Sequence, residues 1–114
     1  MAHNQRNLSG YRAVWLMSMF DLPVDSPKAR HDYTRFRIGL LKQGFSMLQF
    51  SVYARYCDSD ERAEVFRQRI KQMLPPAGEV RIVTITDRQF ARMQVFLGKK
   101  RTAAEKAPEQ LMLF

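Results

Sequence analysis

The chain has 114 residues, 46% of them hydrophobic, and carries a formal net charge of +8. This length suits one domain with a modest core, and the apolar content is too high for a disordered chain. No apolar run approaches the ~20 residues that cross a bilayer, and the polar first residues lack the apolar core of a secretory signal. A single cysteine, Cys57, forbids an internal disulfide, which fits a reducing compartment. Together these features lead us to expect a cytoplasmic protein without a membrane partner.

The excess of basic residues predicts a polyanionic partner. Nineteen Lys and Arg oppose eleven Asp and Glu, and most of the basic residues are arginine. The planar guanidinium group suits phosphate oxygens better than the point charge of lysine does, which favours nucleic acid over a membrane surface. The alternative is a basic protein whose charge serves only solubility.

The first predicted strand ends on a carboxylate. Residues 14–20 form an almost unbroken apolar run, which is typical of a buried strand, and Asp21 follows at once. An acidic side chain at a strand end lies at the rim of a sheet, where it is free to bind a divalent metal such as Mg²⁺. Asp21 is therefore the candidate metal ligand and catalytic residue, although one carboxylate alone makes a poor catalytic site.

A helix is predicted from Ser26 to about Gln43, with Ser26 as the N-cap, Pro27 in the first turn and Gly44 after its end. Its basic residues fall into two rows with a spacing of seven residues. One row comprises Lys28, Arg35 and Lys42, and the other comprises Arg30 and Arg37. A solvated helix face is one interpretation, and a track that contacts nucleic-acid phosphates is the other.

The remaining elements follow from periodicity and turn residues. They are two short strands within 45–57 that break near Gln49 and Phe50, a helix from 58–61 up to Pro75, a strand over 79–86 and a shorter strand over 93–97. This order predicts an α+β, ferredoxin-like βαββαβ fold with an extra C-terminal strand. The sheet is expected to be antiparallel, with both helices on one face.

The other face of the predicted sheet is also apolar. Along the first strand one side carries Val14, Leu16 and Phe20, and the opposite side carries Trp15, Met17 and Met19. We therefore expect a homodimer whose open sheet faces pack together around a two-fold axis. Asp21 shares the outward side, so such a dimer would bring two copies of it together, and the pair could share one Mg²⁺ ion.

Three regions are expected along the chain. They are a flexible N-terminal tail over 1–10, the ferredoxin-like domain over 11–97, and a basic linker with an apolar C-terminal docking peptide over 98–114. The peptide consists of Gln110, Leu111, Met112, Leu113 and Phe114. One interpretation is a strand that adds to the sheet edge of a partner or of the other protomer. The other is a peptide that resembles those by which bacterial replication proteins bind the sliding clamp.

Three segments resemble signatures of the Cas-two family, the small CRISPR-associated proteins that partner the spacer integrase. They are the run from Met17 to Pro23, the helix that ends at Gly44 and Phe45, and the segment from Gln49 to Tyr53. The similarity covers roughly residues 12–97. The sequence departs from the family pattern at two positions. Phe20 stands where the family often has tyrosine, and Met47 stands where it often has a basic residue. Both departures weaken the inference of nuclease activity more than the inference of the fold.

The resemblance implies a homodimer that lies between two dimers of the Cas-one integrase and holds duplex prespacer DNA for insertion into the CRISPR array. On this resemblance Lys28 and Arg30 match the DNA-contacting basic pair of the family, and Arg88 and Arg92 are further expected contacts. Asp21 matches its metal-binding residue, so a Mg²⁺-dependent endonuclease is the alternative function. An unrelated RNA-binding or toxin-like nuclease module of similar layout is a third hypothesis.

Overall fold

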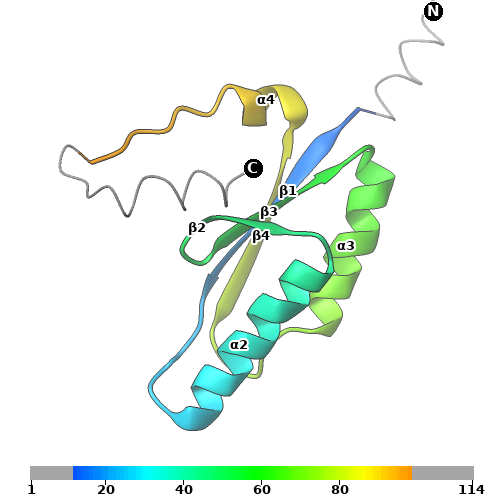
Figure 1. Cartoon of the computed structure of the whole chain (residues 1–114). Coiled ribbons are helices and arrows are strands. Elements are labelled where there is room, and N and C mark those ends of the chain that lie inside the picture. The colour runs from blue at the N-terminus through cyan, green and yellow to red at the C-terminus, as the bar shows by residue number, and fades with distance from the viewer. Residues whose placement is uncertain (1–11, 99–114) are drawn as a thin grey trace, which may run out of the picture.

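The structure is a computed structural model that describes residues 12–98 (Figure 1). Its elements in chain order are β1 (Val14–Asp21), α2 (Pro27–Lys42), β2 (Ser46–Gln49), β3 (Val52–Cys57), α3 (Asp60–Gln72), β4 (Glu79–Thr86) and the short α4 (Asp87–Ala91). In this part of the chain no helix is both long and apolar enough to cross a membrane.

The four strands form one antiparallel sheet in the order β2-β3-β1-β4, so β1 and β3 are central. The helices α2 and α3 pack together on one face of this sheet (Figure 1). Among residues 12–98, only α4 covers part of the opposite face, at one end, and we call this face the open face. This arrangement is α+β and is consistent with the predicted ferredoxin-like layout.

Alternation along β1 separates the two faces. Its even-numbered residues up to Phe20 are buried, whereas the residues between them are only partly buried. The buried side packs against the apolar stripes of the helices, which are Phe36 and Leu40 of α2 and Ala63, Phe66 and Ile70 of α3. Removing these stripes from water, at roughly 25 cal/mol per Å², holds the helices on the sheet.

Capping residues place both helices where the sequence predicts them. The Ser26 hydroxyl accepts a hydrogen bond from the backbone N–H of Ala29, and the Ser59 hydroxyl accepts one from that of Arg62. Gly44 follows α2 with a φ of 88°, a left-handed conformation that glycine adopts without strain. The predicted positions of both helices are confirmed, with α3 ending shortly before Pro75.

The predicted break between two strands near Gln49 and Phe50 is also confirmed. β2 ends at Gln49, and the turn to β3 contains Ser51 with a positive φ of 65°. The Ser51 carbonyl accepts a hydrogen bond of 3.1 Å from the backbone N–H of Phe20. This bond ties the turn to the end of β1 and offsets the cost of the left-handed serine.

The strand predicted over 93–97 is wrong, because residues 93–98 have no regular secondary structure. A capping box ends β4 instead: the Thr86 hydroxyl accepts from the backbone N–H of Gln89, and the Gln89 side chain accepts from that of Thr86. This box starts α4 and turns the chain out of the sheet. A strand requires a neighbour with free backbone groups, and no strand of the described chain pairs with this segment.

The helix α4 is held on the open face by Trp15. The indole Nε1 donates a 2.8 Å hydrogen bond to Asp87 Oδ1, and the indole ring stacks on Phe90 with centroids 3.8 Å apart. Beside this contact lies an apolar cavity of about 430 Å³, whose lining includes Met17, Met19, Leu48, Val52, Met93 and Val95. Phe96 nearby is 83% exposed. Within the described part of the chain, the open face therefore carries exposed apolar side chains.

Candidate functional site

Asp21 is the last residue of β1, and its side chain is exposed. Its Cα partner in the sheet is Glu79, the first residue of β4, which forms an ion pair with Arg81 at 3.3 Å. Gly78 fits closely against this strand end, with a φ of 97°, and a Cβ at that position would lie 2.7 Å from the Asp21 carbonyl oxygen. The carboxylate therefore projects into solvent from a closely packed strand end.

Asp21 of one chain does not complete a metal site. Within residues 12–98 no three His, Cys, Asp or Glu side chains come close enough together to hold an ion. Mg²⁺ usually keeps several waters and is bound through one or two carboxylates. Asp21 of a single chain offers one such carboxylate.

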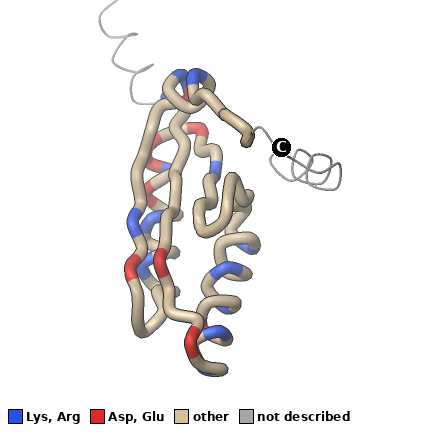
Figure 2. The backbone as a smooth tube through the Cα atoms, turned by 90° about the vertical axis from the view of Figure 1, so that its left-hand side faces the viewer, with Lys and Arg blue, Asp and Glu red and all other residues tan. Residues whose placement is uncertain are grey.

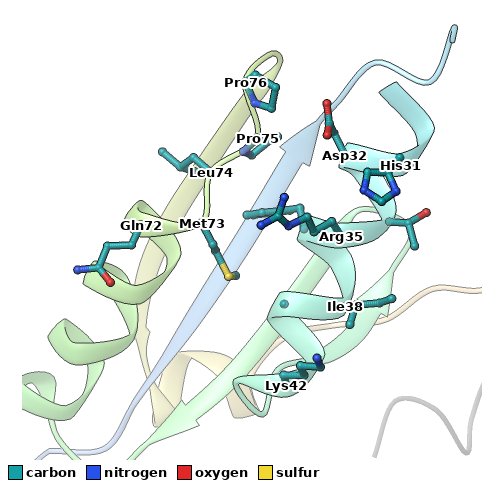
Figure 3. Close-up of a pocket in the computed structure, with 13 residues that line it drawn as sticks. His31, Asp32, Arg35, Ile38, Lys42, Gln72, Met73, Leu74, Pro75 and Pro76 are labelled. Carbon is teal, nitrogen blue, oxygen red and sulfur yellow. The ribbon is translucent and has the colours of Figure 1, made fainter. Parts of the chain in front are cut away.

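The row of Lys28, Arg35 and Lys42 follows the edge of α2 that faces α3. Arg35 and Lys42 line a groove of about 570 Å³ whose other wall is the segment 72–76 (Figure 3). Figure 3 shows Arg35 extending from α2 toward the Met73 side of the groove. Lys28 forms a 3.2 Å ion pair with Asp32, but its side chain is 78% exposed. An exposed ion pair of this kind contributes little and does not prevent contact with a phosphate.

Arg30 and Arg37 lie on another edge of α2 and contact the rest of the protein. Arg30 Nη1 donates a 3.1 Å hydrogen bond to the carbonyl of Val24, which joins the helix to the loop before it. Arg37 is half-buried, and the neighbouring Tyr53 hydroxyl raises the pKa of its guanidinium group. Both arginines therefore have structural partners, in contrast to the exposed Arg35 and Lys42.

Arg88 and Arg92 lie at the far end of the sheet from Asp21. Both are exposed, Arg88 within α4 and Arg92 as its C-cap. The register pairs Val14 with Thr86 at one end of β1 and Asp21 with Glu79 at the other, a separation of roughly 25 Å along the strand. Figure 2 shows the same division, with basic residues on α4 at one end and along the helices. The candidate nucleic-acid residues thus form separate groups.

Reasoning from the sequence missed the arginines that lie on and beneath α3. Arg62 and Arg69 recur with the same seven-residue spacing that marks the row on α2, so a usable signal was present. The sequence places Arg55 only within the predicted strands of 45–57. Its Cα partner is the buried Leu16, which places Arg55 on the helical side of the sheet.

Cys57 does not contribute to this site. Cys57 is buried, and burial raises the pKa of its thiol, which disfavours the reactive thiolate. The predicted docking peptide Gln110–Phe114 lies outside the described residues.

Comparison with known proteins identifies similar chains. The sequence model of the family described as CRISPR associated protein Cas2 matches residues 14–93. A relative from Parvibaculum lavamentivorans, named CRISPR-associated endoribonuclease Cas2, is 54% identical over 101 residues, which are 89% of this chain and 100% of the relative. Relatives of the same name from Flavobacterium psychrophilum and Paracidovorax avenae are 46% and 45% identical over 107 residues, 94% of this chain and 93% and 99% of those proteins.

Proposed function

The chain belongs to the Cas2 family of CRISPR-associated proteins, and on that premise we propose that it acts in CRISPR adaptation by binding duplex prespacer DNA through its phosphates. In this proposal a homodimer of the chain bridges two dimers of the Cas-one integrase while the spacer enters the CRISPR array. The observation that carries the proposal is the exposed basic row of Lys28, Arg35 and Lys42 along α2.

The geometry of that row suits a phosphate backbone. Residues seven apart on an α-helix are separated by about 10.5 Å along its axis, so the row spans about 21 Å. Lysine and arginine contacts of this kind recognise the charge of the duplex and not its sequence, which is the property that a carrier of arbitrary spacers requires.

The open face of the sheet supports the homodimer of the proposal. It carries the apolar cavity beside Met17 and Met19, and the apolar side chains of Val95, Phe96 and Leu97 lie exposed next to it. An apolar surface of this kind is typical of a face that another subunit covers. A second copy packed there would also provide a second Asp21, so that two carboxylates could share one Mg²⁺ ion.

The test measures duplex binding by the full chain, alone and co-purified with the integrase, across a salt series. Lys42→Gln should lower the slope of log K against log salt by about 0.9, the value for one lost phosphate contact. Lys71→Gln is the matched control, because both lysines lie in the last turn of a helix and are exposed. Absence of both duplex binding and an integrase complex would refute the proposal.

A metal-dependent endoribonuclease is the second candidate function, because the relatives described above carry that name. Asp21 would be the metal-binding residue, one from each of two copies. A bound Mg²⁺ ion would stabilise negative charge on the phosphate that is cleaved.

Asp21→Ala separates the two candidates. A DNA scaffold keeps its duplex affinity and its integrase complex in this variant, whereas a nuclease loses Mg²⁺-dependent cleavage of RNA. Asp25→Ala is the control, because Asp25 is an exposed aspartate in the loop after the same strand. RNA cleavage by the unmodified chain that Asp21→Ala abolishes and Asp25→Ala retains would establish the nuclease.

A further inference from the structure

Three arginines surround one buried aromatic ring between β3 and α3. The guanidinium carbons of Arg55, Arg69 and Arg62 lie 3.9, 5.1 and 5.8 Å from the centroid of Phe66. We call Arg55, Arg62 and Arg69 the α3 arginine cluster. Each cation gains a favourable contact with the ring, but three like charges around one ring also repel each other.

Two members of the cluster are held in place by the end of α2. Arg55 Nε donates a 2.7 Å hydrogen bond to the Gln43 carbonyl, and Arg69 Nη1 donates one of 3.0 Å to Gln43 Oε1. Arg55 Nη1 also donates to the carbonyl of Tyr56 at 2.6 Å. Gln43 directly follows Lys42, so the cluster adjoins the end of the basic row on α2.

Two of the three acidic residues of α3, Asp60 and Glu64, are engaged elsewhere. Arg67 forms ion pairs with Asp60 at 2.8 Å and with Glu64 at 2.6 Å, and it also bonds Thr84 of β4. Arg67 is five residues after Arg62, a rotation of about 140° around the helix, so these carboxylates lie on another side of α3. Asp60 and Glu64 therefore form their ion pairs with Arg67 and not with the cluster.

The chemistry of the cluster selects a phosphate ligand over a base. Phe66 is only 3% exposed and cannot stack on a nucleobase, so the cluster presents its guanidinium groups and not an aromatic face. Arg62 and Arg69 are about 10.5 Å apart along the helix, roughly three base-pair steps of a duplex at about 3.4 Å each. Both are exposed.

We propose that the α3 arginine cluster is a second phosphate-binding site for duplex DNA, which continues the α2 row across Gln43 onto α3. Arg62 and Arg69 contact the duplex, and Arg55 is a positioning residue that supports the positive potential beneath them. This inference rests on the proposed binding of duplex DNA and extends its footprint over the helical face of the protein.

The experiment measures anisotropy of a labelled duplex of about 30 base pairs with the full chain, between about 50 and 200 mM salt. Over this fourfold range of salt concentration, the loss of affinity in Arg62→Gln should be about 3.5-fold smaller than in the unmodified chain, and the same holds for Arg69→Gln. In the double variant the loss should be about 12-fold smaller. Lys71→Gln is the matched control, because it removes one charge from the other side of the same helix. Its salt dependence should match that of the unmodified chain.

The Arg62→Lys/Arg69→Lys variant keeps both charges and should keep the full salt dependence, which a purely structural role of the arginines would not predict. Thermal unfolding of every variant checks the fold. If the unmodified chain binds duplex and the double glutamine variant keeps its salt dependence, the cluster is not a binding site and the α2 row stands alone. If the unmodified chain does not bind duplex at any salt, the proposed function and this inference both fail. An effect seen with single-stranded RNA but not with duplex would also overturn the inference.

Discussion

A glutamate placed on the open face tests whether a second copy covers it. Val83 lies on β4 opposite Met17 of β1, on the face away from the helices, and 39% of it is exposed. In a single chain this side chain already reaches water. Val83→Glu should therefore fold normally as a monomer, while a dimer that covers the face would have to bury two carboxylates.

The magnitude follows from these exposures. Fully burying a valine contributes about 1.5 kcal/mol, so covering the exposed part contributes about 0.6 kcal/mol per copy and about 1.2 kcal/mol per dimer. Losing this contribution raises the dissociation constant about eightfold. Burying each unpaired carboxylate costs several kcal/mol more, so the charge dominates and the increase should exceed about 100-fold. Val83→Ala separates the loss of apolar burial from the burial of charge, because it should raise the dissociation constant no more than about eightfold.

Sedimentation equilibrium of the full chain measures the dissociation constant, and thermal unfolding at high dilution checks the monomer. Val65→Glu is the control, because Val65 is 41% exposed on α3, in the helical layer on the other side of the sheet. A dissociation constant that Val83→Glu leaves unchanged would refute the reasoning that the open face is the dimer interface.

Four further predictions follow from contacts described above. Ser18 is fully buried and its hydroxyl has no partner within the described residues, so Ser18→Ala should raise the free energy of unfolding by about 1 kcal/mol, and a lower melting temperature would contradict this. Burial raises the pKa of the Cys57 thiol, so the unfolded chain loses that proton first. Stability to denaturant should consequently fall as pH rises above the ordinary thiol range, and less so in Cys57→Ala. Trp15 is the single tryptophan of the chain, so Phe90→Ala should shift its fluorescence to longer wavelength in the native state, whereas an unchanged spectrum would mean that α4 does not pack there. A synthetic peptide of residues 108–114 should bind the bacterial sliding clamp if the clamp interpretation of the tail is right, and no binding at high micromolar concentration would end that interpretation.

Local patterns account for most of the fold. The serine caps at Ser26 and Ser59 act through neighbours three residues away, and the alternation along β1 and β4 is imposed by each strand itself. Such signals are complete within a few residues, so they can be recognised in the sequence. The capping box from Thr86 to Gln89 was equally local, but α4 is so short that its apolar residues show no helical period.

The errors concern contacts between distant segments. Residues 93–97 have the composition of a strand, yet a strand exists only where another strand offers free backbone groups. The basic residues illustrate the same point, since Lys28 and Arg88 share a charge but lie near opposite ends of β1. Arg55 was missed because its proximity to Phe66 arises from packing between β3 and α3.

The close fit of Gly78 against the end of β1 affects the position of Asp21, although glycine itself has no side chain. A methyl group at residue 78 would collide with the Asp21 carbonyl oxygen and with Leu22, and both of its closest distances would be 2.7 Å. The absence of a side chain at residue 78 therefore allows the acidic end of β1 to lie where it does. Gly78→Ala would displace the carboxylate while leaving every ionisable group of the protein unchanged. The position of the Asp21 carboxylate, as well as its charge, would then determine which groups it can contact.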